Sequence, residues 1–443
     1  GPPGMAEGPT GVAGQTPSVQ SEALATRLEV LQLREEVWRL QAQLQRLQEG
    51  SQPEMDELRQ ASGEAETEGP PQVQRPTPKG ASEPGDRGRQ RVDEDYFDSY
   101  SWFGIHRDML ADRPRTTAYQ QAVEENSSSL FRQPLGHEVS VLDVGCGTSI
   151  LSLFCARAGA AKVTAVDGST FIAAVARDVV KANGYEGIIQ VVEGKLEDLA
   201  PPSEEQKADV LVSEWMGYAL LFESMLDTVL YARKHWLKPG GKILPDVAHM
   251  YMAMASPEAV HTDLDFWNDV YGFDMHCVRV RLEGTLPKEA LVQKVPKECV
   301  ISAPVTVASL DVNTVEVEDL CFATEFEMQP SEEACQAPHA VGEALRCSSF
   351  VLWFDTHFSE RVCPEKQVVL STSPYAPPTH WHQTVLPLST QLDVAPGEVV
   401  RGRFSLGRGV DGNSRRICIA LEYAKCLPDG TPVTPSYTQL HSM

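Results

Sequence analysis

The sequence predicts two successive domains, an α/β domain with a parallel, Rossmann-like sheet and an antiparallel β-barrel. Three observations support this prediction. Predicted strands and helices alternate from residue 139 to residue 245, which is typical of a parallel sheet with helices on both faces. A glycine-rich turn, Gly145-Cys-Gly147, lies between the first of these strands and the first helix. Beyond Pro245 the pattern changes to short β-rich runs separated by proline and glycine, which indicates an antiparallel barrel or sandwich.

The α/β domain is expected over residues 93–245. An aromatic stretch at 96–103 opens it, and helical sequence follows, with Pro114 suited to the first turn of a second helix. The later predicted elements are strands at 139–143, 162–167, 188–193 and 209–214, helices at 150–158, 171–183 and 223–235, and a turn at 238–241.

The barrel domain is expected over residues 246–443. Two of its predicted strands are 305–310 and 361–371. A helix-like insert near 257–275 interrupts the β pattern. This insert carries Phe266, Trp267, Tyr271 and Phe273. Exposed aromatic residues of this kind anchor protein interfaces, so the insert predicts a contact with a second subunit.

Three segments precede the α/β domain. Residues 1–18 are rich in Gly, Pro, Ser and Thr and are expected to be disordered. Residues 19–50 carry a heptad seam, which predicts a coiled-coil helix closed by Gly50. The seam consists of Ala23, Thr26, Val30, Leu33, Val37, Leu40, Leu44 and Leu47. Residues 51–92 return to Pro, Gly, Ser and Glu and predict a flexible linker.

The 443-residue chain is acidic, and its charge is unevenly distributed. The net charge is −24, and residues 93–443 hold 28 basic and 48 acidic residues, so this part alone carries −20. Such a surface repels nucleic acid and anionic membranes and favours basic polypeptides. The ten cysteines show no CxxC spacing, which indicates reduced thiols of a cytosolic or nuclear protein. We expect neither a membrane span nor a signal peptide.

Two glutamates, Glu214 and Glu223, enclose an uncharged apolar segment. The aliphatic run 209–212 predicts a buried strand that ends at Glu214, and the apolar loop should fold back and bring Glu223 toward it. Two carboxylates in a dry pocket repel each other unless a cation lies between them, and arginine offers carboxylates a planar fork of donors. The pair therefore predicts a clamp for a guanidinium group. The alternative is a buried ion pair with a local basic residue, but none lies between Lys207 and Arg233.

The glycine turn predicts a nucleoside-binding site. It follows a strand and opens a helix, and Asp167 ends the next strand 22 residues after Gly145, where it can bind ribose hydroxyls. A dinucleotide-binding turn would need glycine where Ile150 stands, so the turn better suits a nucleoside with a short charged tail, such as S-adenosylmethionine. Leu196 and Glu197, after the following strand, can present a backbone amide and a carboxylate to adenine. These strand ends together predict a class I methyltransferase.

With these motifs assembled, the chain resembles the protein arginine N-methyltransferases over about residues 94–443. The resemblance rests on Tyr96-Phe-Asp-Ser-Tyr100, Phe103-Gly-Ile-His106, Met109-Leu110-x-Asp112, Arg115-Thr116, the paired glutamates, Phe266-Trp-Asn-Asp-Val-Tyr-Gly-Phe273 and Thr379-His380-Trp381. It implies an S-adenosylmethionine methyltransferase domain, a β-barrel with a helical dimerisation arm at about 257–277, and a homodimer. The type I branch fits best, which implies methyl transfer to arginine guanidino nitrogens of proteins, giving monomethyl- and asymmetric dimethylarginine.

The resemblance also implies a role for each matching residue. The cofactor residues would be His106 and Arg115 for the methionine carboxylate, Gly145 and Gly147 for close backbone approach, Asp167 and Ser169 for the ribose, and Leu196 and Glu197 for adenine. The catalytic residues would be Glu214 and Glu223 as the clamp, Met109 beside the guanidinium, Tyr100 closing the pocket, and Asp112 with His380 as a dyad. Glu223 and His380 are both candidates for the proton acceptor, and no metal is implied.

Three features depart from the family pattern. Ser149 stands where the family turn has glycine, which is expected to crowd the cofactor slightly or to alter the start of the helix. The stretch between Arg115 and Gly145 is a few residues longer than in the family, which predicts a surface loop at 126–130. One branch of the family carries an N-terminal C2H2 zinc finger. Because the first cysteine is Cys146, no such finger is expected in this sequence.

Two other functions fit parts of the sequence. A catalytically weak scaffold would assemble partners through the coiled coil and the arm, and Ser149 in the glycine turn is its only support. A small-molecule methyltransferase is disfavoured by the paired glutamates and the acidic surface. The expected partners are therefore basic proteins that contain arginine, either Gly-Arg-rich or ribosomal and RNA-binding, with no direct contact to nucleic acid or membrane.

Overall fold

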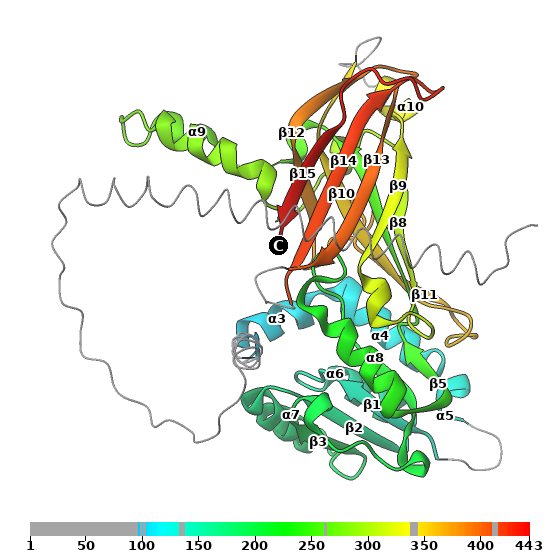
Figure 1. Ribbon diagram of the computed structural model, residues 1–443. Coiled ribbons are helices and arrows are strands. Elements are labelled where there is room, and N and C mark those ends of the chain that lie inside the picture. The colour runs from blue at the N-terminus through cyan, green and yellow to red at the C-terminus, as the bar shows by residue number, and fades with distance from the viewer. Residues whose placement is uncertain are drawn as a thin grey trace, which may run out of the picture. The chain divides into compact units, whose positions relative to one another are not determined.

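The computed structural model describes residues 96–97, 100, 103–132, 138–260, 264–336, 344–409 and 415–443. The expected disordered segment, coiled coil and linker, at 1–18, 19–50 and 51–92, lie outside these residues. The described residues all belong to one unit, which consists of an α/β half and a β-rich half (Figure 1). No helix in this described part is both long and apolar enough to cross a membrane.

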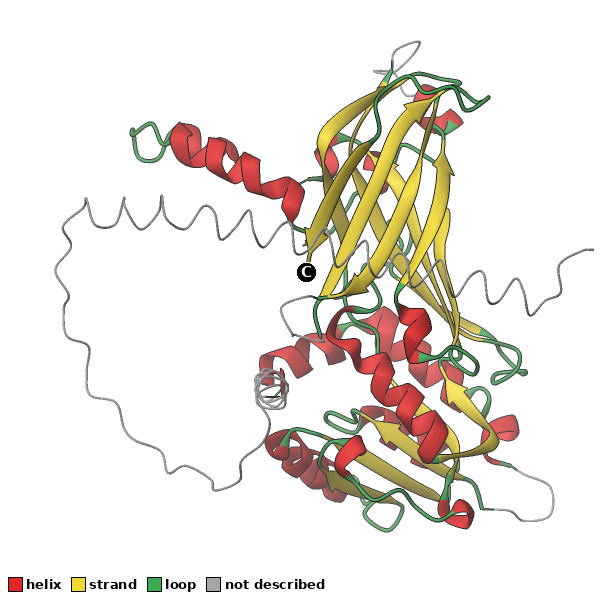
Figure 2. Ribbon diagram, in the orientation of Figure 1, coloured by secondary structure: helices red, strands yellow, loops and turns green. Residues whose placement is uncertain are grey.

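A parallel sheet of five strands forms the α/β half, with the order β3-β2-β1-β4-β5 (Figure 2). Its strands are β1 (Ser140–Val144), β2 (Lys162–Asp167), β3 (Ile189–Glu193), β4 (Ala208–Ser213) and β5 (Leu237–Leu244), and its helices are α6 (Ile150–Ala158), α7 (Thr170–Ala182) and α8 (Met225–His235). The strand order reverses between β1 and β4, and ligands of such sheets bind at the carboxyl ends of the strands at this switch point.

The predicted turn at 238–241 is wrong. These residues lie inside β5, where the pairing with β4 shifts register between Ala208 and Val210. Gly240 has a φ of +77°, so the glycines bend the strand without ending it. The other predicted elements of this half agree with the structure to within two residues.

In the described part of the chain, the helices α3 (Phe103–Ala111), α4 (Arg113–Glu124) and α5 (Ser127–Phe131) precede the sheet. Asp112 caps α4 by accepting the backbone N–H of Arg115, and Pro114 lies in the first turn as predicted. The expected surface loop at 126–130 is wrong, because α5 occupies it and Asn126 is fully buried. The Asn126 amide donates to the carbonyl of Lys366 and accepts that residue's N–H, both at 2.9 Å. Buried hydrogen bonds to a distant loop therefore fold this stretch inward.

The β-rich half consists of two antiparallel sheets that form the barrel. One sheet has the order β7-β12-β10-β6-β8 with β11 on β10, and the other has the order β15-β14-β13-β9. The strands are β6 (Val247–Ala255), β7 (Leu291–Gln293), β8 (Val305–Asp311), β9 (Phe322–Met328), β10 (Leu345–Phe358), β11 (Val368–Ser371), β12 (Gln383–Val394), β13 (Val399–Arg408), β14 (Ile417–Cys426) and β15 (Tyr437–Ser442); a short helix, α10 (Glu332–Gln336), follows β9.

The prediction of a strand over 361–371 is correct only for β11. Arg361 lies outside the strand. Its guanidinium forms ion pairs with Asp246 at 2.8 Å and with Asp311 at 3.0 Å. Val362 and Cys363 donate their backbone N–H groups to Ser359, which closes a turn ahead of the strand.

The insert in the barrel is helical, but its helix lies later than predicted. Short 3-10 turns at Pro257–Ala259 and Leu264–Asn268 precede α9 (His276–Thr285), which projects away from the sheets (Figure 1). Three of the predicted aromatic residues are exposed, with fractions of 47% for Phe266, 96% for Tyr271 and 69% for Phe273. Trp267 is half-buried against the Phe266 ring.

One cluster of buried apolar side chains runs through both halves, from Val141 and Leu211 of the parallel sheet to Phe350 and Phe404 of the barrel. The ten cysteines all lie among the described residues, and no disulfide joins any two of them.

Candidate active site

A cavity of about 660 Å³ opens at the switch point between β1 and β4. Twelve of the fourteen site residues predicted from the sequence line it, namely Tyr100, His106, Met109, Arg115, Gly145, Gly147, Asp167, Leu196, Glu197, Glu214, Glu223 and His380. The other two, Asp112 and Ser169, lie behind the cavity wall, where they are hydrogen-bonded to His380 and Asp167. The structure therefore brings the predicted residues together from both halves of the chain.

The glycine turn between β1 and α6 needs glycine at both positions. Gly145 and Gly147 have φ values of +70° and +51°, which side chains rarely adopt. A Cβ at Gly145 would lie 2.6 Å from the Met225 methyl group, and one at Gly147 would lie 3.4 Å from the His106 ring. The turn therefore presents backbone to the cavity in a conformation that favours glycine.

Asp167, at the end of β2, organises the glycine turn. Its carboxylate accepts the backbone N–H groups of Gly147 and Ser169, both at 2.9 Å. Burial raises the pKa of Asp167, and these hydrogen bonds oppose the shift. Ser169 also caps α7 by accepting the N–H of Ile172. Leu196 is buried, whereas Glu197 is exposed and accepts the Thr228 hydroxyl at 2.6 Å.

Ser149 does not line the cavity. Its backbone has a φ of +67° at the N-cap of α6, and its side chain makes no capping hydrogen bond. Its effects on the cofactor and on the start of the helix stay predictions.

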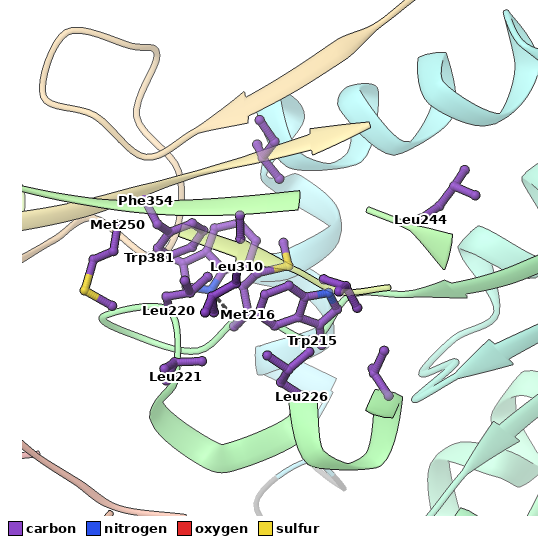
Figure 3. Close-up of a cluster of buried hydrophobic side chains, with 14 of the residues drawn as sticks. Trp215, Met216, Leu220, Leu221, Leu226, Leu244, Met250, Leu310, Phe354 and Trp381 are labelled. Atoms are coloured by element: carbon purple, nitrogen blue, oxygen red, sulfur yellow. Dashed lines mark hydrogen bonds between the residues drawn. The ribbon is translucent and has the colours of Figure 1, made fainter. Parts of the chain in front are cut away.

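The segment between the two glutamates folds back into the core, as predicted. Trp215, Met216, Leu220 and Leu221 are all buried. Figure 3 shows these side chains gathered with Met250, Leu310, Phe354 and Trp381 from the barrel half. The Trp381 indole N–H donates to the carbonyl of Met216 at 2.8 Å, which fixes the loop against the barrel. We call residues 214–223 the glutamate hairpin.

Three residues of this hairpin, Ala219, Leu220 and Glu223, have a left-handed backbone although none is glycine, and so does Ser224 directly after it; their φ values lie between +44° and +71°. Each such residue costs about 1–2 kcal/mol and persists only where its surroundings enforce it. Gly217 provides part of that constraint, because a Cβ there would lie 1.9 Å from the carbonyl oxygen of Phe222. The packing that offsets this strain keeps Glu223 at the cavity.

Glu214 forms a buried ion pair with Arg115. The Nη2 and Nε atoms of Arg115 lie 2.8 and 3.1 Å from Glu214 Oε2, and Nη1 donates to the Met109 carbonyl at 3.1 Å. Arg115 lies 99 residues from Glu214 in the sequence, so the absence of a basic residue between Lys207 and Arg233 did not exclude this ion pair. The second oxygen, Oε1, accepts the Met216 N–H at 3.3 Å.

Glu223 is held by Tyr100, whose hydroxyl donates to Oε2 at 2.7 Å. Burial raises the pKa of Glu223, the Tyr100 hydrogen bond lowers it, and the charge of Glu214 raises it again; the net shift is upward. This electrostatic coupling supports the view that the two carboxylates share one site.

The predicted dyad of Asp112 and His380 is present. His380 Nδ1 lies 2.7 Å from Asp112 Oδ2, and its backbone N–H donates to the same oxygen at 2.8 Å. Burial alone would raise the pKa of Asp112, but the hydrogen bonds from His380 and the Arg115 N–H outweigh it and lower the pKa. The His380 ring also packs on Trp381, with centroids 4.0 Å apart.

Several residues of the cavity were not predicted from the sequence. Arg415 lies 3.7 Å above the Tyr96 ring and donates to the Glu223 carbonyl at 2.9 Å. Arg408 donates to Asp227 at 2.6 Å. Tyr96 belongs to an aromatic motif of the sequence, whereas Arg408 ends β13 and Arg415 precedes β14, and neither belongs to a motif. Only the packing of the barrel on the α/β half brings them here.

Two family models match the chain over the two halves. The arginine methyltransferase oligomerization subdomain matches residues 246–426. A methyltransferase domain matches residues 141–241.

Curated relatives are similar over most of the chain. A probable protein arginine N-methyltransferase 3 of Arabidopsis thaliana is 41% identical over 344 residues, which cover 76% of this chain and 53% of the relative. The sequence motifs resemble this same member of the family. Protein arginine N-methyltransferase 6 of Danio rerio is 42% identical and aligns over 76% of this chain and 90% of its own length. The chain spans little more than half the length of the relatives named as member 3.

Solved structures have the same fold. The Trypanosoma brucei PRMT1 enzyme–prozyme heterotetrameric complex with AdoHcy superposes with a TM-score of 0.66 at 36% identity, over 78% of this chain and 99% of the other. On these similarities, and on the site that both halves build together, the chain belongs to the protein arginine N-methyltransferase family.

Proposed function

We propose that the protein transfers methyl groups from S-adenosylmethionine to arginine guanidino nitrogens of protein substrates. The observation that carries this proposal is the pair of carboxylates, Glu214 and Glu223, in the same cavity as a glycine turn shaped for a nucleoside. A guanidinium is the cation that such a pair recognises.

The residues at the glycine turn fit S-adenosylmethionine, which supplies an electrophilic methyl group when bound. Gly145 and Gly147 leave room for the cofactor beside exposed backbone. Asp167, held by two backbone N–H groups, would bind the ribose hydroxyls, and Glu197 would lie near adenine. His106 and Arg115 would hold the carboxylate. Because Arg115 already bonds Glu214, we propose that it ties the cofactor end of the cavity to the clamp.

The carboxylates position the substrate. Glu214 and Glu223 would hydrogen-bond one side of the guanidinium and leave another nitrogen directed toward the methyl group, while Met109 packs beside it. In-line methyl transfer depends on this alignment, which contributes several kcal/mol, on the order of a thousandfold in rate. The hairpin strain and the Trp381 anchor fix Glu223 before the substrate arrives.

We propose that Glu223 accepts the proton that the methylated guanidinium releases. Its pKa is raised by burial and by Glu214, so it is a stronger base than an ordinary glutamate. His380, the alternative acceptor, is tied to Asp112 through Nδ1 and acts here to support the clamp.

The variant Tyr100→Phe tests this assignment. It removes the hydrogen bond that lowers the pKa of Glu223, so that pKa rises and the acid limb of the kcat profile moves to higher pH. If the acid limb stayed in place in Tyr100→Phe and moved in His380→Gln, His380 would be the proton acceptor.

The activity itself is tested by radiolabelled methyl transfer to a Gly-Arg-rich peptide, followed by separation of the methylated arginines. We expect monomethyl- and asymmetric dimethylarginine, the products of the type I reaction. Symmetric dimethylarginine would contradict type I, and binding of S-adenosylmethionine without any transfer would favour the scaffold function.

We also propose a homodimer that forms through the arm. Phe266, Tyr271 and Phe273 expose large aromatic surfaces there, and Phe103 of α3 and Phe171 of α7 are exposed as an edge-to-face pair. Residues 94–443 alone should dimerise in light scattering, and charge substitutions at Trp267 and Tyr271 should give monomers with impaired transfer. Val433→Glu, at an exposed barrel position, is the control. A monomeric and fully active core would exclude this interface.

Finally, we propose a reducing compartment, cytosol or nucleus. The absence of disulfides among the described cysteines supports it. Cell fractionation tests this location, and recovery from an oxidising compartment would contradict it.

A further inference from the structure

We propose that a second cavity, on the outer face of the barrel, binds another arginine side chain of the same substrate polypeptide. The inference rests on the proposed function for its substrate class. The cavity has a volume of about 310 Å³, and its lining includes Tyr251, Trp353, Asp355, Ser371 and Tyr375. We call it the outer cavity.

Strand pairing explains why these residues meet. β6 and β10 are antiparallel neighbours, with Tyr251 opposite Trp353 and His249 opposite Asp355, and Asp355 also lies opposite Ser371 of β11. Side chains alternate between the faces of a sheet, so these residues share one face, while their neighbours Met250 and Phe354 point into the core. The strand register therefore places the lining residues of β6, β10 and β11 next to one another on this face.

Three aromatic residues border the cavity: Trp353, which is buried, Tyr251, which is half-buried, and Tyr375, which is exposed. The Tyr251 and Trp353 rings lie 5.9 Å apart between centroids and 28° from parallel. Tyr375 adds a third ring from the segment after β11, with 57% of its surface exposed. Cations bind the faces of aromatic rings, and the planar guanidinium group of arginine stacks on them as well.

The charges at the outer cavity are negative and incompletely paired. Asp355 Oδ1 is buried and has no hydrogen-bond partner in the described part of the chain. None of the described residues that line the cavity is lysine or arginine. Burial, and then the charge of Glu333, raises the pKa of Tyr375, so a second carboxylate acts on this site. Burying an unpaired carboxylate oxygen is costly, and a bound guanidinium would satisfy it.

Two histidines lie near Asp355 but do not line the outer cavity: His249, opposite it on β6, and His357, two residues further along β10. Burial and then His249 lower the pKa of His357, which disfavours its charged form. No lysine or arginine joins them in the described lining, so a guanidinium group can enter the cavity without meeting a permanent positive charge.

One short segment borders both cavities. After β11, Ser373, Tyr375 and Ala376 line the outer cavity, whereas His380 and Trp381 line the active-site cavity. The five Cα–Cα steps from Tyr375 to His380 span at most about 17 Å when extended. A substrate with two arginines separated by several residues can therefore place one in each cavity.

The test compares two peptides on the full chain. Both carry the same target arginine, and about eight residues away one has a second arginine and the other has glutamine. We expect the wild type to show a KM about 3- to 10-fold lower for the two-arginine peptide, with equal kcat. Asp355→Asn and Tyr375→Ala should abolish this difference and leave the glutamine peptide unaffected. Val369→Ala, at an exposed position of β11 outside the cavity lining, should preserve it.

Other outcomes would overturn the proposal. These are equal KM values for the two peptides in the wild type, or an equal KM rise for both peptides in Asp355→Asn. A peptide with lysine at the second position that matches the arginine peptide would contradict recognition of a guanidinium. If neither peptide is methylated, the proposed function fails. The outer cavity is then tested by calorimetric titration with both peptides, where equal affinities for wild type and Asp355→Asn would exclude it.

Discussion

The glycine turn and the glutamate hairpin occupy equivalent places in the sheet but are built in opposite ways. They follow β1 and β4, which pair in parallel, so both lie at the same edge. Both need a left-handed backbone. The turn meets this need with Gly145 and Gly147, whereas the hairpin uses residues with side chains, Glu223 among them.

The difference follows from what each loop presents. A loop that offers backbone to a ligand gains from glycine, because a Cβ would occupy the ligand's space. A loop that offers a carboxylate needs the side chain, so the strain of its backbone must be offset by packing. The buried Trp215, Leu220 and Leu221 provide that packing.

Removing the charge at the clamp should have the largest effect. Glu214→Gln should reduce transfer on the order of a thousandfold, because a neutral amide neither holds a guanidinium by charge nor pairs with Arg115. Radiolabelled transfer to a Gly-Arg-rich peptide measures the loss, and calorimetry should find S-adenosylmethionine affinity largely retained. Glu186→Gln, at an exposed position, is the control. A rate within about tenfold of wild type would refute the clamp.

The support of the hairpin is tested next. Gly217→Ala should lower the free energy of unfolding by about 3 kcal/mol, because its Cβ would lie 1.9 Å from a backbone carbonyl oxygen. Transfer should fall as well, since Glu223 loses its position. Gly407→Ala is a matched control with no atom within 4 Å of the added Cβ. Equal denaturant midpoints for the two variants would show that the hairpin tolerates the change.

The glycine turn should respond through cofactor affinity. Asp167→Ala and Arg115→Ala should each weaken S-adenosylmethionine by about 1–3 kcal/mol, because each removes charge-assisted hydrogen bonds. Only Arg115→Ala should also impair transfer at saturating cofactor, since Arg115 bonds Glu214 as well. Calorimetry and saturation kinetics separate the two effects. Unchanged affinity in both variants would exclude the proposed cofactor site.

The smallest effect is expected at Ser149, which has a left-handed backbone inside the glycine turn. Ser149→Gly should raise the free energy of unfolding by about 0.5–1 kcal/mol, because glycine adopts this φ without strain but loses more chain entropy. S-adenosylmethionine affinity should not change, because Ser149 does not line the cavity. Ser203→Gly, at an ordinary φ of −62°, should give no gain. If Ser203→Gly also raised the free energy of unfolding, the left-handed φ of Ser149 would not explain the gain in Ser149→Gly.

The α/β half was predictable because its signals are local. Strand and helix periods, the turn glycines and Asp167 all lie within short stretches of sequence, and the parallel sheet brings their ends together. The apolar character of 215–222 likewise predicted burial. The turn at 238–241 failed because glycines can bend a strand without ending it.

The long-range contacts were less predictable. The partner of Glu214, the inward packing of Asn126 and the place of Arg415 all depend on residues far apart in the sequence. The pairing of Asp112 with His380 was found only through the family resemblance, since 268 residues separate them. The spacing of apolar residues along the chain does not indicate which distant residues will be in contact.

The continuous core has a consequence for unfolding. Trp215, Leu220 and Leu221 belong to the same buried cluster as Met250, Leu310 and Phe354 of the barrel. Neither half can separate without exposing these side chains to water, so the two should melt in one cooperative transition. A recombinant α/β half without its barrel would lose the hairpin packing first and bind substrate arginine poorly, even if its glycine turn survived. The residues of the proposed active site therefore depend on the folding of both halves together.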